Sequence, residues 1–83
     1  MRITARTFAS LRELSVDRCE LSLENGATVD DAWASLAAMY PALDRQRPYV
    51  RAARNGTYVA WDEAVADGDV VAFLPPVSGG SAC

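Results

Sequence analysis

The first third of the chain contains two segments in which apolar and polar residues alternate. In residues 2–8, Ile3 and Ala5 fall on one side and Phe8 falls on the other. Such alternation is typical of a strand with one buried face, so we predict strands over 2–8 and 18–24. With Ile3 and Ala5 in the core, Phe8 points away from it. The predicted buried face of the second strand carries Cys19, Leu21 and Leu23.

Helical signals lie between and after these strands. Ser10 and Glu13 have the spacing of a capping box and predict one short helical turn. The main helix is predicted over 29–40, because Thr28 can cap its N-terminus and Pro41 ends it. Its apolar residues recur at helical spacing and form one stripe for the core. The stripe consists of Val29, Ala32, Trp33, Leu36, Ala37 and Tyr40.

The second half of the chain carries the signals of a hairpin. Asn55-Gly56 is the dipeptide most typical of a tight two-residue hairpin turn. A second turn at 67–69 leads into a last apolar run. We predict an irregular connection over 42–48, paired strands over 49–54 and 57–60, and a final strand over 70–74.

The order of these elements, strand, strand, helix, hairpin and strand, defines the fold class. One long helix can cover one face of a sheet, and the right-handed crossover rule places the first strand beside the last. We therefore predict an α+β protein with a ubiquitin-like β-grasp fold, a mixed sheet with one main helix on one face. The β-grasp domain is predicted to span residues 1–74.

The other face of this sheet is predicted to be uncovered. By strand parity Phe8 and Leu74 fall on it, and Tyr58 beside the hairpin turn joins them. Single apolar residues on a surface are normal and need no function. Three that converge on one uncovered face favour a protein-docking surface. Phe8, Tyr58 and Leu74 are our candidate partner-docking residues.

The composition of the chain changes after Leu74. Pro75-Pro76 cannot donate to a sheet ladder, and the following residues offer nothing to pack. We predict a flexible tail over 75–83 that contains the diglycine Gly79-Gly80. Without Cβ atoms, such a backbone can enter a narrow channel of another protein. On composition alone, however, a disordered end is the commoner explanation.

Composition excludes several classes of function. Eighty-three residues form one domain with no room for a deep interdomain cleft, so we expect a carrier, substrate or subunit. A net charge of −3 with scattered arginines argues against nucleic acid as a partner. The chain has no His, the commonest general base, and no Lys. It has no apolar run long enough to span a bilayer, so we expect no membrane partner and a cytoplasmic location.

Two further groups of residues have possible chemistry. The acidic pairs Asp62-Glu63 and Asp67-Gly68-Asp69 resemble fragments of metal or acid–base sites, but turn formation and solvation explain them better. Cys83 has no His to activate it as a nucleophile. Neither group is a candidate catalytic centre.

The end of the chain resembles a known family. The run from Val71 to Gly80, preceded by 67–69, resembles the C-terminal signature of the MoaD/ThiS sulfur carriers, and is most similar to MoaD, the small subunit of molybdopterin synthase. The segments 8–14 and 55–59 resemble the family's first strand and turn and its central hairpin. The resemblance therefore spans the chain, and it favours a function for the diglycine.

The resemblance implies a chemistry at the C-terminal carboxylate of Gly80. An E1-like adenylating enzyme would use ATP to activate it, and sulfur from a sulfurtransferase or cysteine desulfurase would convert it to a thiocarboxylate. The molybdopterin synthase large subunit would then receive the tail, and the carrier itself would bind no metal or cofactor. The residues implied to thread the partners' channels are Pro75, Pro76, Val77, Ser78 and Gly79.

The chain departs from the family because Ser81-Ala82-Cys83 follows the diglycine. A peptide bond after Gly80 leaves no carboxylate to adenylate, so we expect cleavage between Gly80 and Ser81. Similar extended carriers suggest a JAMM-type zinc peptidase.

Other functions remain open. The sulfur acceptor could belong to thiamine, tRNA or cysteine synthesis instead of molybdopterin synthesis. The chain could also be a ubiquitin-like modifier joined through Gly80 to lysines of other proteins, or a passive interaction module.

Overall fold

The computed structural model describes residues 1–76 and contains the five strands that the alternation and hairpin patterns predict. The strands are β1 (Arg2–Thr7), β2 (Arg18–Ser22), β3 (Arg51–Arg54), β4 (Thr57–Val59) and β5 (Val70–Leu74). The helical segments are α1 (Ala9–Glu13), α2 (Val29–Met39) and the 3₁₀ helix η1 (Pro41–Tyr49).

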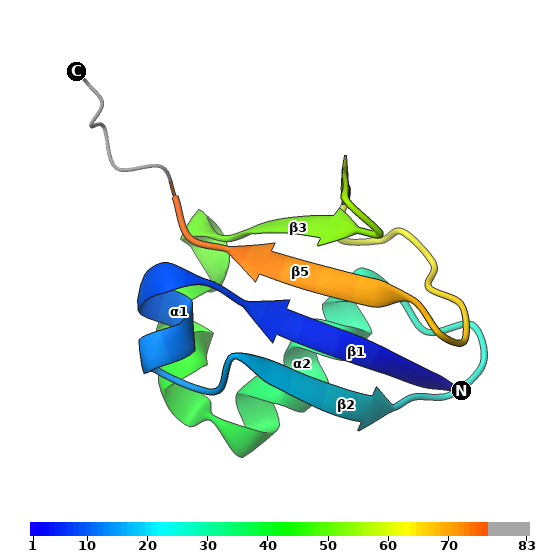
Figure 1. The fold of residues 1–83 in the computed structure, drawn as a ribbon, viewed down its shortest axis with the longest axis horizontal. Coiled ribbons are helices and arrows are strands. Elements are labelled where there is room, and N and C mark those ends of the chain that lie inside the picture. The colour runs from blue at the N-terminus through cyan, green and yellow to red at the C-terminus, as the bar shows by residue number, and fades with distance from the viewer. Residues whose placement is uncertain (77–83) are drawn as a thin grey trace.

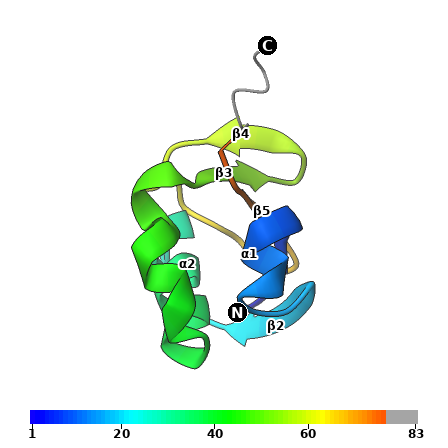
Figure 2. The same cartoon turned by 90° about the vertical axis from the view of Figure 1, so that its left-hand side faces the viewer.

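The strands form one mixed sheet in the order β2-β1-β5-β3-β4 (Figure 1). The first and last strands, β1 and β5, run parallel at its centre, and the other neighbours are antiparallel. Figure 2 shows α2 and the segment after it on one side of the sheet. Within residues 1–76 no helix or strand covers the other side, and the predicted β-grasp fold is confirmed.

The predicted alternation in β1 is confirmed by burial. Ile3, Ala5 and Thr7 are buried, whereas the residues between them are more exposed. They face a core in which Phe73 of β5 packs edge-on against Trp33 of α2. The other core residues that are fully buried are Leu11, Val29, Ala32, Leu36, Leu43 and Val71.

The main helix begins as its sequence predicts. The Thr28 hydroxyl accepts a hydrogen bond from the Asp31 backbone amide, and the Asp31 carboxylate accepts one from the Thr28 amide. This capping box satisfies amides that have no partner within the helix, and such a cap contributes about 1 kcal/mol. The helix ends at Met39, two residues before Pro41.

Three local predictions are wrong. The expected capping box of Ser10 does not form, because Phe8 occupies the N-cap of α1 and Ser10 lies inside the helix. The stretch predicted to be irregular is the 3₁₀ helix η1, with Pro41 in its first turn and Leu43 buried in the core. Because η1 extends to Tyr49, β3 begins two residues later than predicted, at Arg51.

Candidate functional site

The sheet register brings the three predicted docking residues onto one face. Thr7 lies opposite Phe73, so the next residues of these parallel strands, Phe8 and Leu74, are neighbours on the outward side. Tyr58 lies opposite Ala53, and Ala53 lies opposite Ala72, two residues before Leu74. Phe8 and Leu74 are half-buried, whereas Tyr58 is 66% exposed. We call this uncovered surface of the five strands the outward face.

An arginine from β1 orients Phe8 on this face. The Arg6 guanidinium lies 5.1 Å from the centre of the Phe8 ring, a distance at which cation and ring attract each other. The same guanidinium lies 3.7 Å from the Asp17 carboxylate. Phe8 is therefore held against the sheet next to Leu74, although it lies just beyond the end of β1.

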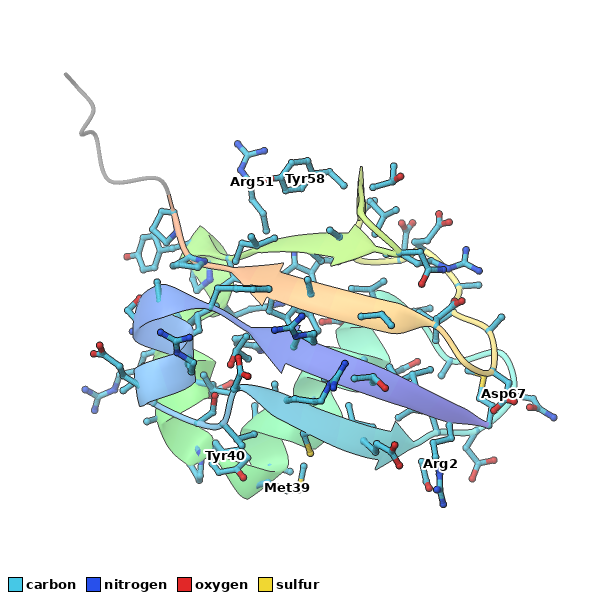
Figure 3. The ribbon with its side chains drawn as sticks, in the orientation of Figure 1. Arg2, Met39, Tyr40, Arg51, Tyr58 and Asp67 are labelled. Atoms are coloured by element: carbon cyan, nitrogen blue, oxygen red, sulfur yellow. The ribbon has the colours of Figure 1, made fainter. Side chains whose placement is uncertain are left out.

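Two residues that were not predicted from the sequence lie near these three. Arg51 of β3 lies opposite Leu74 and is exposed on the outward face (Figure 3). Tyr49, 62% exposed, precedes β3 at the end of the sheet where β5 finishes. Strand parity across the Asn55-Gly56 turn could have identified Arg51. Tyr49 could not be placed in this way, because the predicted strand boundary was wrong.

β5 sets the direction in which the chain leaves the domain. It is hydrogen-bonded to β1 on one side and to β3 on the other, so its last residue Leu74 is fixed by both neighbours. Pro75 and Pro76 follow outside the sheet, as expected of residues that cannot extend the ladder. The predicted threading residues Val77, Ser78 and Gly79, and the predicted cleavage site at Gly80 and Ser81, lie outside the described residues.

The beginning of β5 is anchored by the buried carboxylate of Asp69. It accepts hydrogen bonds from the Ala66 amide at 2.7 Å, from the Asn55 side chain at 3.0 Å and from Arg54 Nε at 2.6 Å. The side-chain hydrogen bond from Asn55 contributes most to lowering the pKa of Asp69, followed by the Ala66 amide and Arg54. These contacts join the start of β5 to the hairpin turn.

Two further acidic residues in these turns, Glu63 and Asp67, are paired with other parts of the fold. Glu63 forms an ion pair with Arg54 at 3.1 Å. The Asp67 carboxylate accepts a hydrogen bond from the Arg2 backbone amide at 2.7 Å, and Figure 3 shows these two residues near each other at the same end of the sheet. Across residues 1–76 no group of three or more His, Cys, Asp or Glu side chains could hold a metal ion. In the same part of the chain, no helix has the length and apolar character that crossing a bilayer requires.

The protein has a mixed sheet with one main helix on one side, and its central last strand is followed in sequence by a diglycine. These features define a ubiquitin-like protein of the sulfur-carrier type. The comparisons with known proteins agree. The ThiS family model matches residues 6–80, and the chain belongs to this family.

Individual relatives carry two kinds of name. The chain is 40% identical to the molybdopterin synthase sulfur carrier subunit of Chlamydomonas reinhardtii over 96% of its own length and 100% of the relative's. It is 36% identical to small archaeal modifier protein 1 of Haloferax volcanii, over 90% and 97% of the two chains. A crystal structure of SAMP1 from Haloferax volcanii superposes with a TM-score of 0.87 at 34% identity, covering 96% and 100%.

Proposed function

We propose that this protein carries sulfur for molybdopterin synthesis as a thiocarboxylate at Gly80. The observation that carries the proposal is the continuity of the central strand β5 with the sequence Pro75 to Gly80, the residue at which the family match also ends. The similarity to a molybdopterin synthase sulfur carrier subunit supports this acceptor in preference to thiamine, tRNA or cysteine synthesis.

The proposed chemistry begins with a poor electrophile, a carboxylate. In the E1-like adenylating enzyme, the Gly80 carboxylate attacks the α-phosphate of ATP and displaces pyrophosphate. A persulfide sulfur supplied by a sulfurtransferase or cysteine desulfurase then displaces AMP, and reduction of the acyl disulfide by a thiol leaves the thiocarboxylate. The carrier supplies a threadable tail and a docking face, and it binds no cofactor of its own.

The same face is proposed to serve successive partners. Phe8, Tyr58 and Leu74 would contact first the adenylating enzyme and then the large subunit of molybdopterin synthase, while Pro75 to Gly79 enter their channels. Because Leu74 is both the last residue of β5 and part of the outward face, docking fixes where the tail starts. These steps take place in the cytoplasm.

Maturation is part of the proposal. Ser81 follows Gly80 through a peptide bond, so the carboxylate appears only after hydrolysis of that bond. We propose that a JAMM-type zinc peptidase performs it. A Gly80→Ala variant should resist trimming or adenylation, because a Cβ there obstructs a channel shaped for two glycines.

The intact mass of the protein from its native cells tests this proposal. We expect a species that ends at Gly80, with a fraction heavier by the exchange of one oxygen for sulfur. A thiol-alkylating reagent can also modify the free Cys19 in every species that ends at Gly80, so the thiocarboxylate fraction should gain one more alkyl group than the rest. A population found only with Ser81 and the following residues attached would contradict the carrier mechanism.

A second candidate function is supported by the similarity to small archaeal modifier protein 1. In that case, the activated Gly80 would be transferred to lysines of other proteins. The chain has no Lys, so it could not form lysine-linked chains on itself. An N-terminally tagged chain should then appear in high-mass species that survive reducing denaturation, and truncation before Gly79 should abolish them.

A further inference from the structure

Charge is distributed unevenly between the two sides of the molecule. The strand residues of the outward face include four arginines and one acidic residue, although the whole chain has a net charge of −3. The acidic side chains of α2 lie on the other side of the sheet. The charged strand residues of the outward face are Arg2, Arg6, Arg18, Glu20 and Arg51.

Two of these arginines are not neutralised within the described part of the chain. Arg2 lies 3.4 Å from Glu20, and Arg6 lies near Asp17. Among residues 1–76 no acidic side chain lies within ion-pair distance of Arg18 or Arg51, and both are exposed. The outward face therefore presents free positive charge beside its apolar residues.

The position of Arg18 brings two like charges together on neighbouring strands, although Asp17 also pairs with Arg6. Arg6 and Arg18 lie directly opposite each other on β1 and β2, and like charges in such a cross-strand pair destabilise a sheet. A local conflict of this kind is expected where a residue serves a contact outside the fold. Arg51 has a different setting, because it lies opposite Leu74 and diagonally across from Tyr58.

We propose that the outward face binds an acidic protein surface, with Arg51 and Arg18 forming ion pairs around the apolar contact of Phe8, Leu74 and Tyr58. This inference rests on the proposed function, since it specifies the chemistry of the partner that adenylates Gly80. A central apolar and aromatic contact with arginine beside it has the composition of a protein-binding hot spot.

The charge of the outward face favours a protein as its binding partner. Nucleic acid binding needs enough cationic residues to neutralise several phosphates, and among the described residues of this face only Arg18 and Arg51 lack an acidic partner. A second copy of the chain would have to contact the outward face with its own acidic side. That side is formed by α2 and η1, and it also carries arginines. An acidic surface on the adenylating enzyme meets the same charges without these conflicts.

The test uses the chain ending at Gly80 and the purified E1-like adenylating enzyme of the same organism, with ATP-dependent pyrophosphate release as the readout. Arg51→Glu and Arg18→Glu should each raise the KM for the carrier about tenfold at low salt and leave kcat unchanged. High salt should shrink the difference, because it screens the exposed charges.

Arg45→Glu is the matched control. Arg45 is exposed on η1, has no acidic partner among residues 1–76, and undergoes the same change of charge away from the outward face. Its KM should stay within about twofold of the wild type, as expected for a charge outside the contact. Circular dichroism of each variant checks that the fold is intact.

The outcomes separate the two proposals. If the wild-type chain is never adenylated, the proposed function fails and this inference fails with it. If the wild type is adenylated but Arg51→Glu and Arg18→Glu behave like Arg45→Glu, only this inference is overturned. It is also overturned if KM is unchanged while Arg51→Glu abolishes binding to total tRNA or concentration-dependent dimerisation, which would assign the face to nucleic acid or to a second copy.

Discussion

Asp69 holds together two turns that are distant in the sequence. Asp69 is 8% exposed, and its carboxylate accepts hydrogen bonds from Arg54, Asn55 and the Ala66 amide. Asn55 also accepts a hydrogen bond from the Val70 amide, so it ties the hairpin turn to the first residue of β5. The sequence predicted both turns but not this connection, because a carboxylate in a turn is usually solvated.

The pKa of Asp69 makes stability depend on pH. Its folded pKa lies below the unfolded value of about 4, so ionised Asp69 stabilises the fold above pH 4 and the contribution is lost as pH falls through the folded pKa. Asp69→Asn should lower the free energy of unfolding by about 2 kcal/mol at pH 7, because charged hydrogen bonds are lost in a buried site. Urea unfolding at pH 7 and pH 3 measures both effects.

The control for this prediction is Asp62→Asn, a change at an exposed carboxylate in a nearby turn that has no hydrogen bond or ion pair with any side chain of residues 1–76. It should change the free energy of unfolding by less than about 0.5 kcal/mol. If the difference between wild type and Asp69→Asn is as large at pH 3 as at pH 7, ionisation of Asp69 is not its cause.

Asn55 is needed for its backbone as well as its side chain. It has φ +50° and precedes Gly56 at φ +88°, both in the left-handed region that a two-residue hairpin turn requires. Asn55→Ala should cost about 2 kcal/mol, because alanine is strained there and both side-chain hydrogen bonds disappear. Asn55→Asp, which keeps the conformation and the acceptor but places a second carboxylate beside Asp69, should also destabilise. A Gly56→Ala variant isolates the backbone effect in the same urea titration.

At the scale of elements, strands and helix were predictable and the 3₁₀ segment was not. The period of two in β1 and of 3.6 in α2 follows from which residues face the core, so burial and sequence carry the same information. η1 has two prolines and one buried residue, Leu43. A single buried residue produces no repeating apolar pattern from which a helix could be predicted. The docking residues were predicted because alternation along the strands places their apolar side chains on the outward face. Arg51 was missed because a charged residue on that face is what any solvent-exposed strand position would show.

The cross-strand pair of Arg6 and Arg18 predicts a trade-off between stability and binding. Arg18→Glu places opposite charges directly across β1 and β2, so the free energy of unfolding should rise by about 0.5 kcal/mol. The same variant is expected to bind its partner more weakly. Urea unfolding at low and high salt measures the gain, which should shrink as salt increases. A loss of stability at low salt would show that Asp17 already neutralises the pair.

At the scale of the whole molecule, folding and chemistry occupy different parts of the chain. The buried core comes from residues between Ile3 and Phe73, and β5 is paired on both edges before Pro75. The proposed chemistry takes place at Gly80, six residues beyond the last strand. Sequence could locate this division because the composition changes at Pro75. It could not show that Leu74, the last strand residue before Pro75, lies opposite Arg51, since that follows from the pairing of β5 with β3.

This separation predicts that the tail can be removed without loss of the fold. A chain ending at Pro76 keeps every core residue and every strand pair, so its free energy of unfolding should stay within about 0.5 kcal/mol of the full chain. Adenylation should be abolished, because no carboxylate reaches the active site of the partner. In contrast, the shortened chain should still compete with the chain ending at Gly80 for the adenylating enzyme, since Phe8, Tyr58, Leu74 and Arg51 remain. A shortened chain that folds but does not compete would show that binding resides in the tail and not in the outward face, whereas one that unfolds would place part of the domain's stability beyond Pro76.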